Sequence, residues 1–173
     1  MKVAEADFLR AHGGCWTARQ VPEFSVVNVH AMEIPAPAVK IFPLLGSRDL
    51  LAPGLFWRFL LGFRVGIGKI FGWDRGIALN RPQALEAGKY FGFFHVIYVD
   101  APREVGMTVE NRLTRALLSW VLMENTGRTT VFGVTCANFK GRQGQLYWQV
   151  IRPFQDGLIE DSLRIVRKRV GND

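Results

Sequence analysis

The first part of the chain shows a strand pattern followed by a helix pattern. Residues 25–34, SVVNVHAMEI, alternate as a half-buried strand does, and the Pro-Ala-Pro segment at 35–37 ends the run. Pro37 suits the first turn of a helix because its missing N–H would have no partner there. Apolar residues then recur at helical spacing, at Ala38, Ile41, Phe42 and Leu45. The pattern predicts a strand over 25–34 and a short helix after it.

A longer helical pattern covers residues 50–72. At 100° per residue, small and basic residues gather on one side, at Arg58, Gly62, Val65 and Lys69. Large apolar residues fall roughly opposite, at Phe56, Leu60, Phe63, Ile67 and Ile70. The glycines of GFRVGIGKIFG (62–72) leave room for a break near Gly66 or Gly68. We expect this segment to cover one mouth of a cavity, followed by a loop over 74–90.

The same glycine-rich stretch does not fit a phosphate-binding loop. A P-loop requires Gly at position 63 and Ser or Thr at position 70, where this chain has Phe63 and Ile70. In the dinucleotide pattern, the third glycine would come one residue too late, at Gly72. These mismatches argue against nucleotide binding.

From Lys89 onward the period changes to that of strands. Four runs are rich in β-branched and aromatic residues: 89–100, 104–113, 116–125 and 128–140. Asn125-Thr126-Gly127, between the last two runs, predicts a tight hairpin. Residues 144–170 return to a helical pattern, and Pro153 predicts a kink or a helix that begins near Arg152.

This order of elements predicts an α+β fold. We expect an N-terminal arm over 1–24 and a single helix-grip domain over 25–170, in which a curved antiparallel sheet wraps around a long C-terminal helix. Such a sheet leaves an apolar space between itself and the helix.

Composition supports one globular domain and an anionic partner. The 173 residues are 49% hydrophobic, and the net charge is +7. The densest basic cluster, at 164–169, is interpreted as a solvated helix end. No apolar leader or membrane-spanning stretch is apparent, so we expect a cytoplasmic protein. We expect no metal, no cofactor and no nucleic-acid partner, and oligomeric state stays open.

Two segments carry a resemblance to known families. The opening VHAMEIPAPAVKIFPLL (29–45) resembles the start of the START-like, polyketide cyclase-like (SRPBCC) helix-grip superfamily. The segment 128–164 resembles the C-terminal part of the DUF2867 family, through Phe139, Gly141, Arg142, Gly144, Tyr147, Arg152, Pro153 and Phe154. The helical run around Arg64 also resembles that family. Gln155 departs from the pattern, since many relatives would have His there.

The resemblance implies a fold and an apolar cavity, and no particular reaction. The ligand-binding candidates combine aromatic walls with cations that would hold a polar head: Phe63, Arg64, Phe93, Trp120, Tyr147 and Arg152. Our first hypothesis is binding of a hydrophobic or lipid-like small molecule in the internal cavity.

Two alternatives stay open. A cyclase- or hydratase-type enzyme would use Glu33, Glu124 or a histidine as acid or base in the same cavity. His30 and His95 are expected to be sheet residues with local hydrogen-bond partners. A peripheral module would instead contact membranes through residues 55–71.

Overall fold

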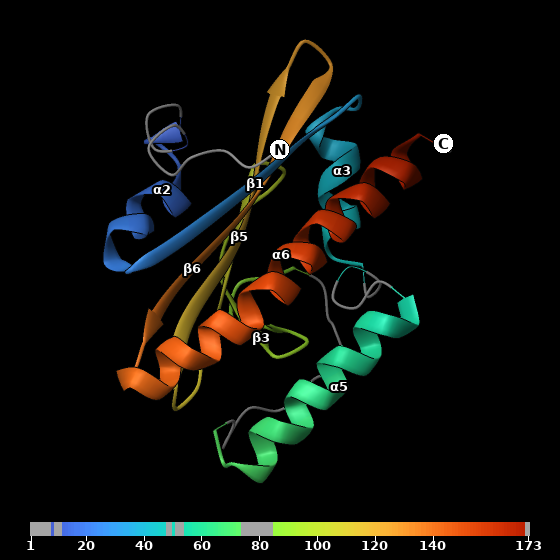
Figure 1. Ribbon diagram of the computed structural model, residues 1–173. Coiled ribbons are helices and arrows are strands. Elements are labelled where there is room, and N and C mark those ends of the chain that lie inside the picture. Colours follow the sequence, from blue (N-terminus) through green and yellow to red (C-terminus); the bar gives the residue numbers. More distant parts are fainter. Residues whose placement is uncertain (1–7, 9–11, 48–49, 51–53, 74–84, 172–173) are drawn as a thin grey trace.

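A computed structural model describes residues 8, 12–47, 50, 54–73 and 85–171 (Figure 1). The helical elements are α2 (Trp16–Gln20), the 3-10 helix η1 (Val21–Glu23), α3 (Ala38–Leu45), α5 (Gly54–Ile70) and α6 (Gly141–Val170). The strands are β1 (Val26–Ile34), β2 (Tyr90–Phe91), β3 (Phe94–Asp100), β4 (Glu104–Glu110), β5 (Thr114–Asn125) and β6 (Arg128–Phe139).

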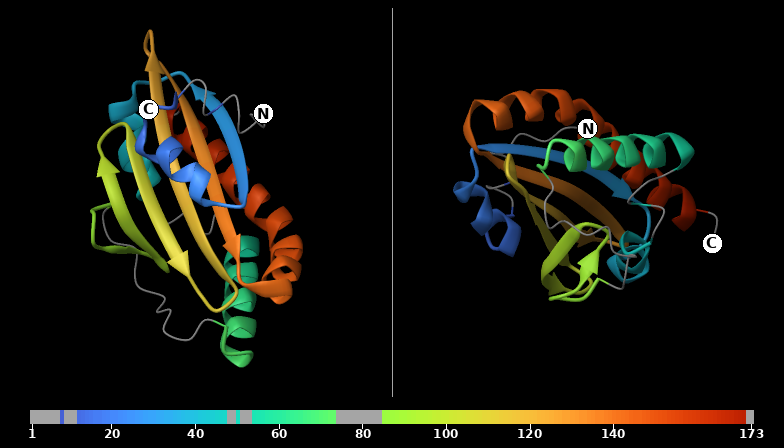
Figure 2. Two further views of the ribbon diagram at one scale, coloured as in Figure 1. Left: turned by 90° about the vertical axis from the view of Figure 1, so that its left-hand side faces the viewer. Right: turned by 90° about the horizontal axis from the view of Figure 1, so that it is seen from below.

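The strands form one antiparallel sheet of six strands in the order β1-β6-β5-β4-β3-β2. The predicted α+β class, the curved antiparallel sheet and the long C-terminal helix are therefore confirmed (Figure 2). The run predicted over 89–100 is divided, because a turn at Gly92, with φ 66°, separates β2 from β3. The hairpin predicted at 125–127 joins β5 to β6, with positive φ at Thr126 and Gly127.

Both faces of the sheet are covered, as Figure 1 shows with α2 on one side and α3, α5 and α6 on the other. Under α6 and α3 lies the larger core, which includes Ile41, Trp120, Val131, Ile159 and Leu163. The opposite face is covered by the N-terminal arm, through Phe8, Ala18 and Val21, packed on β1, β5 and β6. Glu104 on β4 accepts hydrogen bonds from the backbone N–H groups of Trp16 and Thr17, at 3.0 and 2.6 Å. This carboxylate holds the start of α2 on the sheet.

Helix α6 begins earlier than one of our two predictions allowed. It runs from Gly141 to Val170 through Pro153, so a start near Arg152 is wrong. The reason is packing before the proline. Trp148 is buried and lies against Phe139, with ring centroids 5.6 Å apart, while Gly144 fits against the backbone carbonyl of Leu113. These contacts hold the first turns in place although Pro153 removes one helical hydrogen bond.

Helix α5 is continuous, so the chain does not break at Gly66 or Gly68. Gly68 is buried, so we read it as a point of close approach in a helix and not as an interruption. The side chains of α5 at 60, 61, 64, 67, 69 and 70 lie outside the described part of the structure.

Candidate functional site

Helix α5 contacts the first two-thirds of α6 through two tryptophans. Trp57 Nε1 donates a hydrogen bond of 2.9 Å to Asp161 Oδ2, and its ring lies over Gly157. Trp73, just after α5, meets Tyr147 with ring centroids 6.0 Å apart. The start of α5 thus meets the later residues of α6, and its end meets the earlier ones. The two helices therefore lie antiparallel beside each other (Figure 2).

Large apolar side chains are exposed on both helices of this pair. We define the apolar face as the exposed large hydrophobic residues of these segments: Leu55, Phe56, Phe59, Phe63, Phe71, Leu146, Val150 and Phe154. Their exposed fractions run from 43% for Phe154 to 84% for Leu55. Phe59 and Phe63, one helical turn apart, stack with interplanar angle 13°. Exposed apolar patches on a globular domain commonly mark contact sites, and the stacked pair of Phe59 and Phe63 forms such a patch on α5.

This exposure differs from what the amphipathic pattern suggested. The apolar side of 50–72 was expected to cover a cavity, yet Phe56 and Phe63 point to solvent at 63% and 59% exposure. The physical reason is that Trp57 and the small residues Gly68 and Gly72 approach the rest of the domain. Small residues allow that close approach, and the phenylalanines are left outside.

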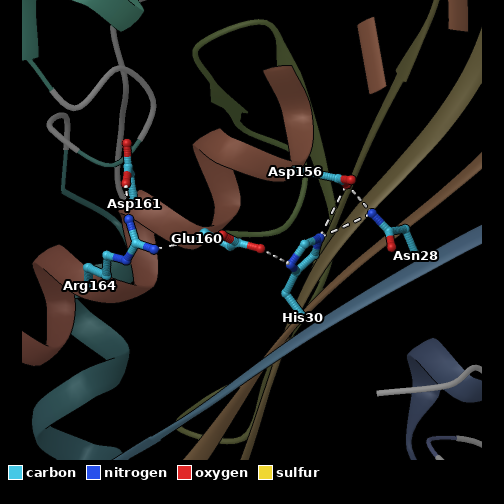
Figure 3. Close-up of polar contacts among 6 residues, drawn as sticks. All are labelled: Asn28, His30, Asp156, Glu160, Asp161 and Arg164. Atoms are coloured by element: carbon cyan, nitrogen blue, oxygen red, sulfur yellow. Dashed lines mark hydrogen bonds and ion pairs between the residues drawn. The ribbon is translucent and has the colours of Figure 1, made fainter. Parts of the chain in front are cut away.

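A polar cluster lies between β1 and α6 (Figure 3). His30 is only 2% exposed, and its Nε2 is 3.2 Å from Asp156 Oδ1 while its Nδ1 is 3.3 Å from Glu160 Oε1. Asn28 donates to the same Asp156 oxygen. Each ring nitrogen of this buried histidine therefore lies within contact distance of a carboxylate on α6.

The cluster continues toward α5. Glu160 pairs with Arg164 at 3.8 Å, and Arg164 pairs with Asp161 at 3.0 Å (Figure 3). Asp161 is also the acceptor for Trp57. A chain of polar contacts therefore joins buried His30 on β1 to the start of α5.

The six predicted ligand-binding residues fall into two groups. Phe63 and Arg152 are exposed on α5 and α6, and Tyr147 is half-buried against Trp73. Arg64 belongs to α5, but its side chain lies outside the described residues. These residues come from neighbouring helices. Two others lie elsewhere: Phe93 packs on Phe94 in the turn before β3, and Trp120 is 4% exposed in the core under α6.

The predicted acid–base candidates have structural contacts. Glu33 pairs with Arg128 at 2.6 Å on the surface, and Glu124 accepts a hydrogen bond of 2.8 Å from the backbone N–H of Ala38 at the start of α3. His30 has local partners, as expected for a sheet residue. Sequence reasoning missed those partners, Asp156 and Glu160. The sequence did contain a signal for these partners. Asp156 and Glu160 are four residues apart, so they share one face of the predicted helix, and Asn28 and His30 share one face of the predicted strand.

The two hollows described on the molecule are open to solvent. One, of about 470 Å³, is lined by Met32, Arg164, Arg167, Lys168 and Gly171, and the other, of about 250 Å³, lies beside Cys15, Trp16 and Tyr98. Beneath the second half of α6, Ile159 lies directly against Gly133 and Trp120. Residues of the helix and of the sheet belong to one buried hydrophobic cluster there.

Partial burial changes the pKa of the Cys15 thiol. Cys15, at the start of α2, accepts a hydrogen bond from Ala18 through its sulfur. Desolvation raises the pKa of this thiol above its usual value, so less of it is thiolate at neutral pH.

No helix among the described residues is long and apolar enough to cross a membrane.

The fold places this chain in a class of small α+β proteins with a curved antiparallel sheet and a long C-terminal helix. The family profile of DUF2867, described as a protein of unknown function, matches residues 21–161, and the chain belongs to that family. No curated protein matches the chain.

Solved structures share the fold at low sequence identity. A conserved protein from Geobacillus kaustophilus is 12% identical with a TM-score of 0.52, covering 85% of this chain and 96% of that one. A protein from Arthrobacter aurescens is 9% identical with a TM-score of 0.53, covering 86% and 88%. A protein from Rhodobacter sphaeroides is 12% identical with a TM-score of 0.53, covering 84% and 92%. At such identities the likeness concerns the fold alone.

Proposed function

We propose that the protein binds a hydrophobic or lipid-like molecule, and that α5 and the first half of α6 supply the apolar contact. The observation that carries this proposal is the apolar face, on which four phenylalanines of residues 54–73 are each about 60% exposed or more. Removing such side chains from water is favourable by roughly 25 cal/mol per Å² of apolar surface before the costs of association. A ligand with an aliphatic or aromatic body offers that burial.

The neighbouring cations suit a ligand with a polar or anionic head. Arg152 is exposed on α6, and Arg64 belongs to the facing helix α5. A guanidinium binds a carboxylate or phosphate through charge-assisted hydrogen bonds. The proposal therefore keeps the kind of ligand expected from the sequence. It moves the contact from an enclosed cavity to the surface of the helix pair.

We further propose that the domain is a START-like, SRPBCC-type helix-grip fold. Support comes from the order of its elements: a first strand, short helices, a run of antiparallel strands and a long terminal helix against the sheet. The cytoplasmic location expected from the sequence remains a prediction.

Binding can be tested with cis-parinaric acid, a fatty acid whose fluorescence rises in apolar sites. We expect enhanced probe emission and energy transfer from Trp57 and Trp73, weakened at least tenfold in Phe59→Ser/Phe63→Ser. The matched control is Val39→Ser, which removes a 64% exposed side chain on α3, away from the face. Unchanged binding by the double variant would overturn the assignment of the site.

One observation favours the enzyme as second candidate. His30 with Asp156 and Glu160 brings together side chains of the types used in general acid–base catalysis. If a cyclase or hydratase reaction is found, His30→Gln should abolish turnover and leave cis-parinaric acid binding intact. Turnover that survives this substitution would remove His30 from the mechanism.

A further inference from the structure

The apolar face lies within two stretches of the chain that contain neither Asp nor Glu. Residues 50–73 contain no Asp or Glu, and neither do residues 125–155. Within these segments, α5 carries Arg58, Arg64 and Lys69, while Arg142 and Arg152 lie on α6 beside Leu146, Val150 and Phe154. Every formal charge on α5 and on the first half of α6 is therefore positive.

Over the whole chain the charges are mixed, with 22 Lys and Arg residues against 15 Asp and Glu. The net charge of +7 includes 15 acidic residues, and they lie outside those two segments. On the second half of α6, Arg164 pairs with Glu160 and Asp161, and the basic residues Arg167, Lys168 and Arg169 follow in the last turn. The two acid-free segments thus carry both an excess of positive formal charge and the exposed phenylalanines.

We propose that this surface docks onto an anionic lipid bilayer, with α5 and the first half of α6 lying flat in the interface. This inference rests on the proposed binding of lipid-like molecules and names the partner. Apolar side chains of an interfacial helix enter the boundary between headgroups and acyl chains, while flanking Lys and Arg meet the headgroup phosphates. Both helices present large apolar residues at one-turn spacing, at Phe59 and Phe63 on α5 and at Leu146, Val150 and Phe154 on α6.

The charge pattern favours a bilayer over a second copy of this chain. In a symmetric dimer through the apolar face, the cations of both protomers would approach one another, because these segments offer no carboxylate to pair with them. An anionic membrane provides many phosphates at once and needs no complementary protein surface. The geometry also needs no opening of the fold, since the phenylalanines are already exposed.

Flotation of the purified full chain with lipid vesicles tests the proposal. We expect association with vesicles of phosphatidylglycerol and phosphatidylcholine, and much weaker association with phosphatidylcholine alone. Arg142→Gln and Arg152→Gln should each weaken binding about fivefold, following the contribution of one cation near an anionic surface. Raising the salt concentration should release the protein.

A further double variant measures the contribution of the apolar side chains to vesicle binding. Phe59→Ser/Phe63→Ser should lose vesicle binding, and it should stay folded because both side chains are exposed, as circular dichroism would verify. The matched controls are Val39→Ser for apolar exposure and Arg103→Gln for charge, and both should bind like the parent. Arg103 is exposed at the turn between β3 and β4, away from the helix pair.

The outcomes distinguish this proposal from the one on which it rests. Equal binding to neutral and anionic vesicles would overturn the electrostatic part. Binding of cis-parinaric acid without vesicle binding would overturn the proposed membrane docking and leave the proposed binding of a small ligand in place. Failure of both probes would overturn both. A concentration-dependent dimer that Phe59→Ser/Phe63→Ser abolishes, without vesicle binding, would assign the face to a second copy.

Discussion

Gly133, on β6, lies directly against Ile159 of α6. A Cβ atom there would be 2.7 Å from Cγ2 of Ile159 and 2.9 Å from Cζ3 of Trp120. Gly133→Ala should therefore lower the free energy of unfolding by about 1–3 kcal/mol, because a filled core resists one extra methyl group. Urea denaturation measures the difference.

Gly62→Ala is the matched control. Gly62 lies inside α5, and nothing lies within 4 Å of its added Cβ. Alanine favours a helix over glycine by about 1 kcal/mol, so this variant should be as stable as the parent or more stable. Equal destabilisation by both substitutions would contradict the close contact at Gly133.

The buried imidazole is the second residue on which stability should depend. His30→Gln retains a polar side chain, but a flexible amide cannot reproduce the contacts that the two ring nitrogens make with Asp156 and Glu160. We expect the free energy of unfolding to fall by about 1–3 kcal/mol. His95→Gln, on β3, is the control and should change it by no more than about 0.5 kcal/mol. Indistinguishable effects would mean that the cluster does not stabilise the α6–β1 contact.

Among the elements, α5 is joined to α6 by a hydrogen bond at its start. Trp57 joins its start to Asp161, so Trp57→Phe removes that hydrogen bond and keeps an aromatic ring. We expect faster amide hydrogen exchange in residues 54–73 with little change in β4–β6. Trp16→Phe, on the opposite face of the sheet, should leave exchange in α5 unchanged. Faster exchange throughout the chain would instead indicate a global loss of stability.

Sequence patterns predicted the elements better than they predicted how the elements face one another. Strand alternation located β1 and β6, and the positive-φ turn at Thr126 and Gly127 was visible as Asn-Thr-Gly. The orientation of α5 was not predictable, since Phe63 is equally consistent with a core-facing or a solvent-facing helix side. Which side packs depends on where Trp57 finds Asp161, about a hundred residues later in the chain.

For the candidate site, too, the sequence predicted residue types better than it predicted contacts between distant elements. Phe63, Tyr147 and Arg152 were identified by residue type, and they belong to two adjacent helices. The partners of His30 were missed because a contact between a strand and a distant helix has no local signature. Trp120 could not be assigned to the core or to an open wall before the faces of β5 were known.

At the scale of the whole molecule, the N-terminal arm completes the second face of the sheet. Phe8, Ala18 and Val21 cover apolar residues of the central strands, and Glu104 is buried where it holds α2. A chain that begins at residue 25 should expose that face and leave the carboxylate without its donors. We expect such a truncation to lose a sharp thermal transition and to aggregate.

Scanning calorimetry of the truncated and full chains measures this effect. Arg19→Ala, an exposed change within the same arm, should leave the transition close to that of the parent. A truncated chain that melts as cooperatively as the full chain would show that residues 25–170 suffice as a folding unit.

The strand order has a consequence for how the chain is made. β1 is the first strand in the sequence, yet its neighbour is β6, so that Val26 pairs with Ala137. While the protein is being synthesised, β1 therefore waits until nearly the entire chain has left the ribosome before it gains a partner. The hairpin of β5 and β6 can form without it, and α6 emerges after both. Until then an apolar strand stays unpaired, and an unpaired strand exposed during synthesis is prone to aggregate.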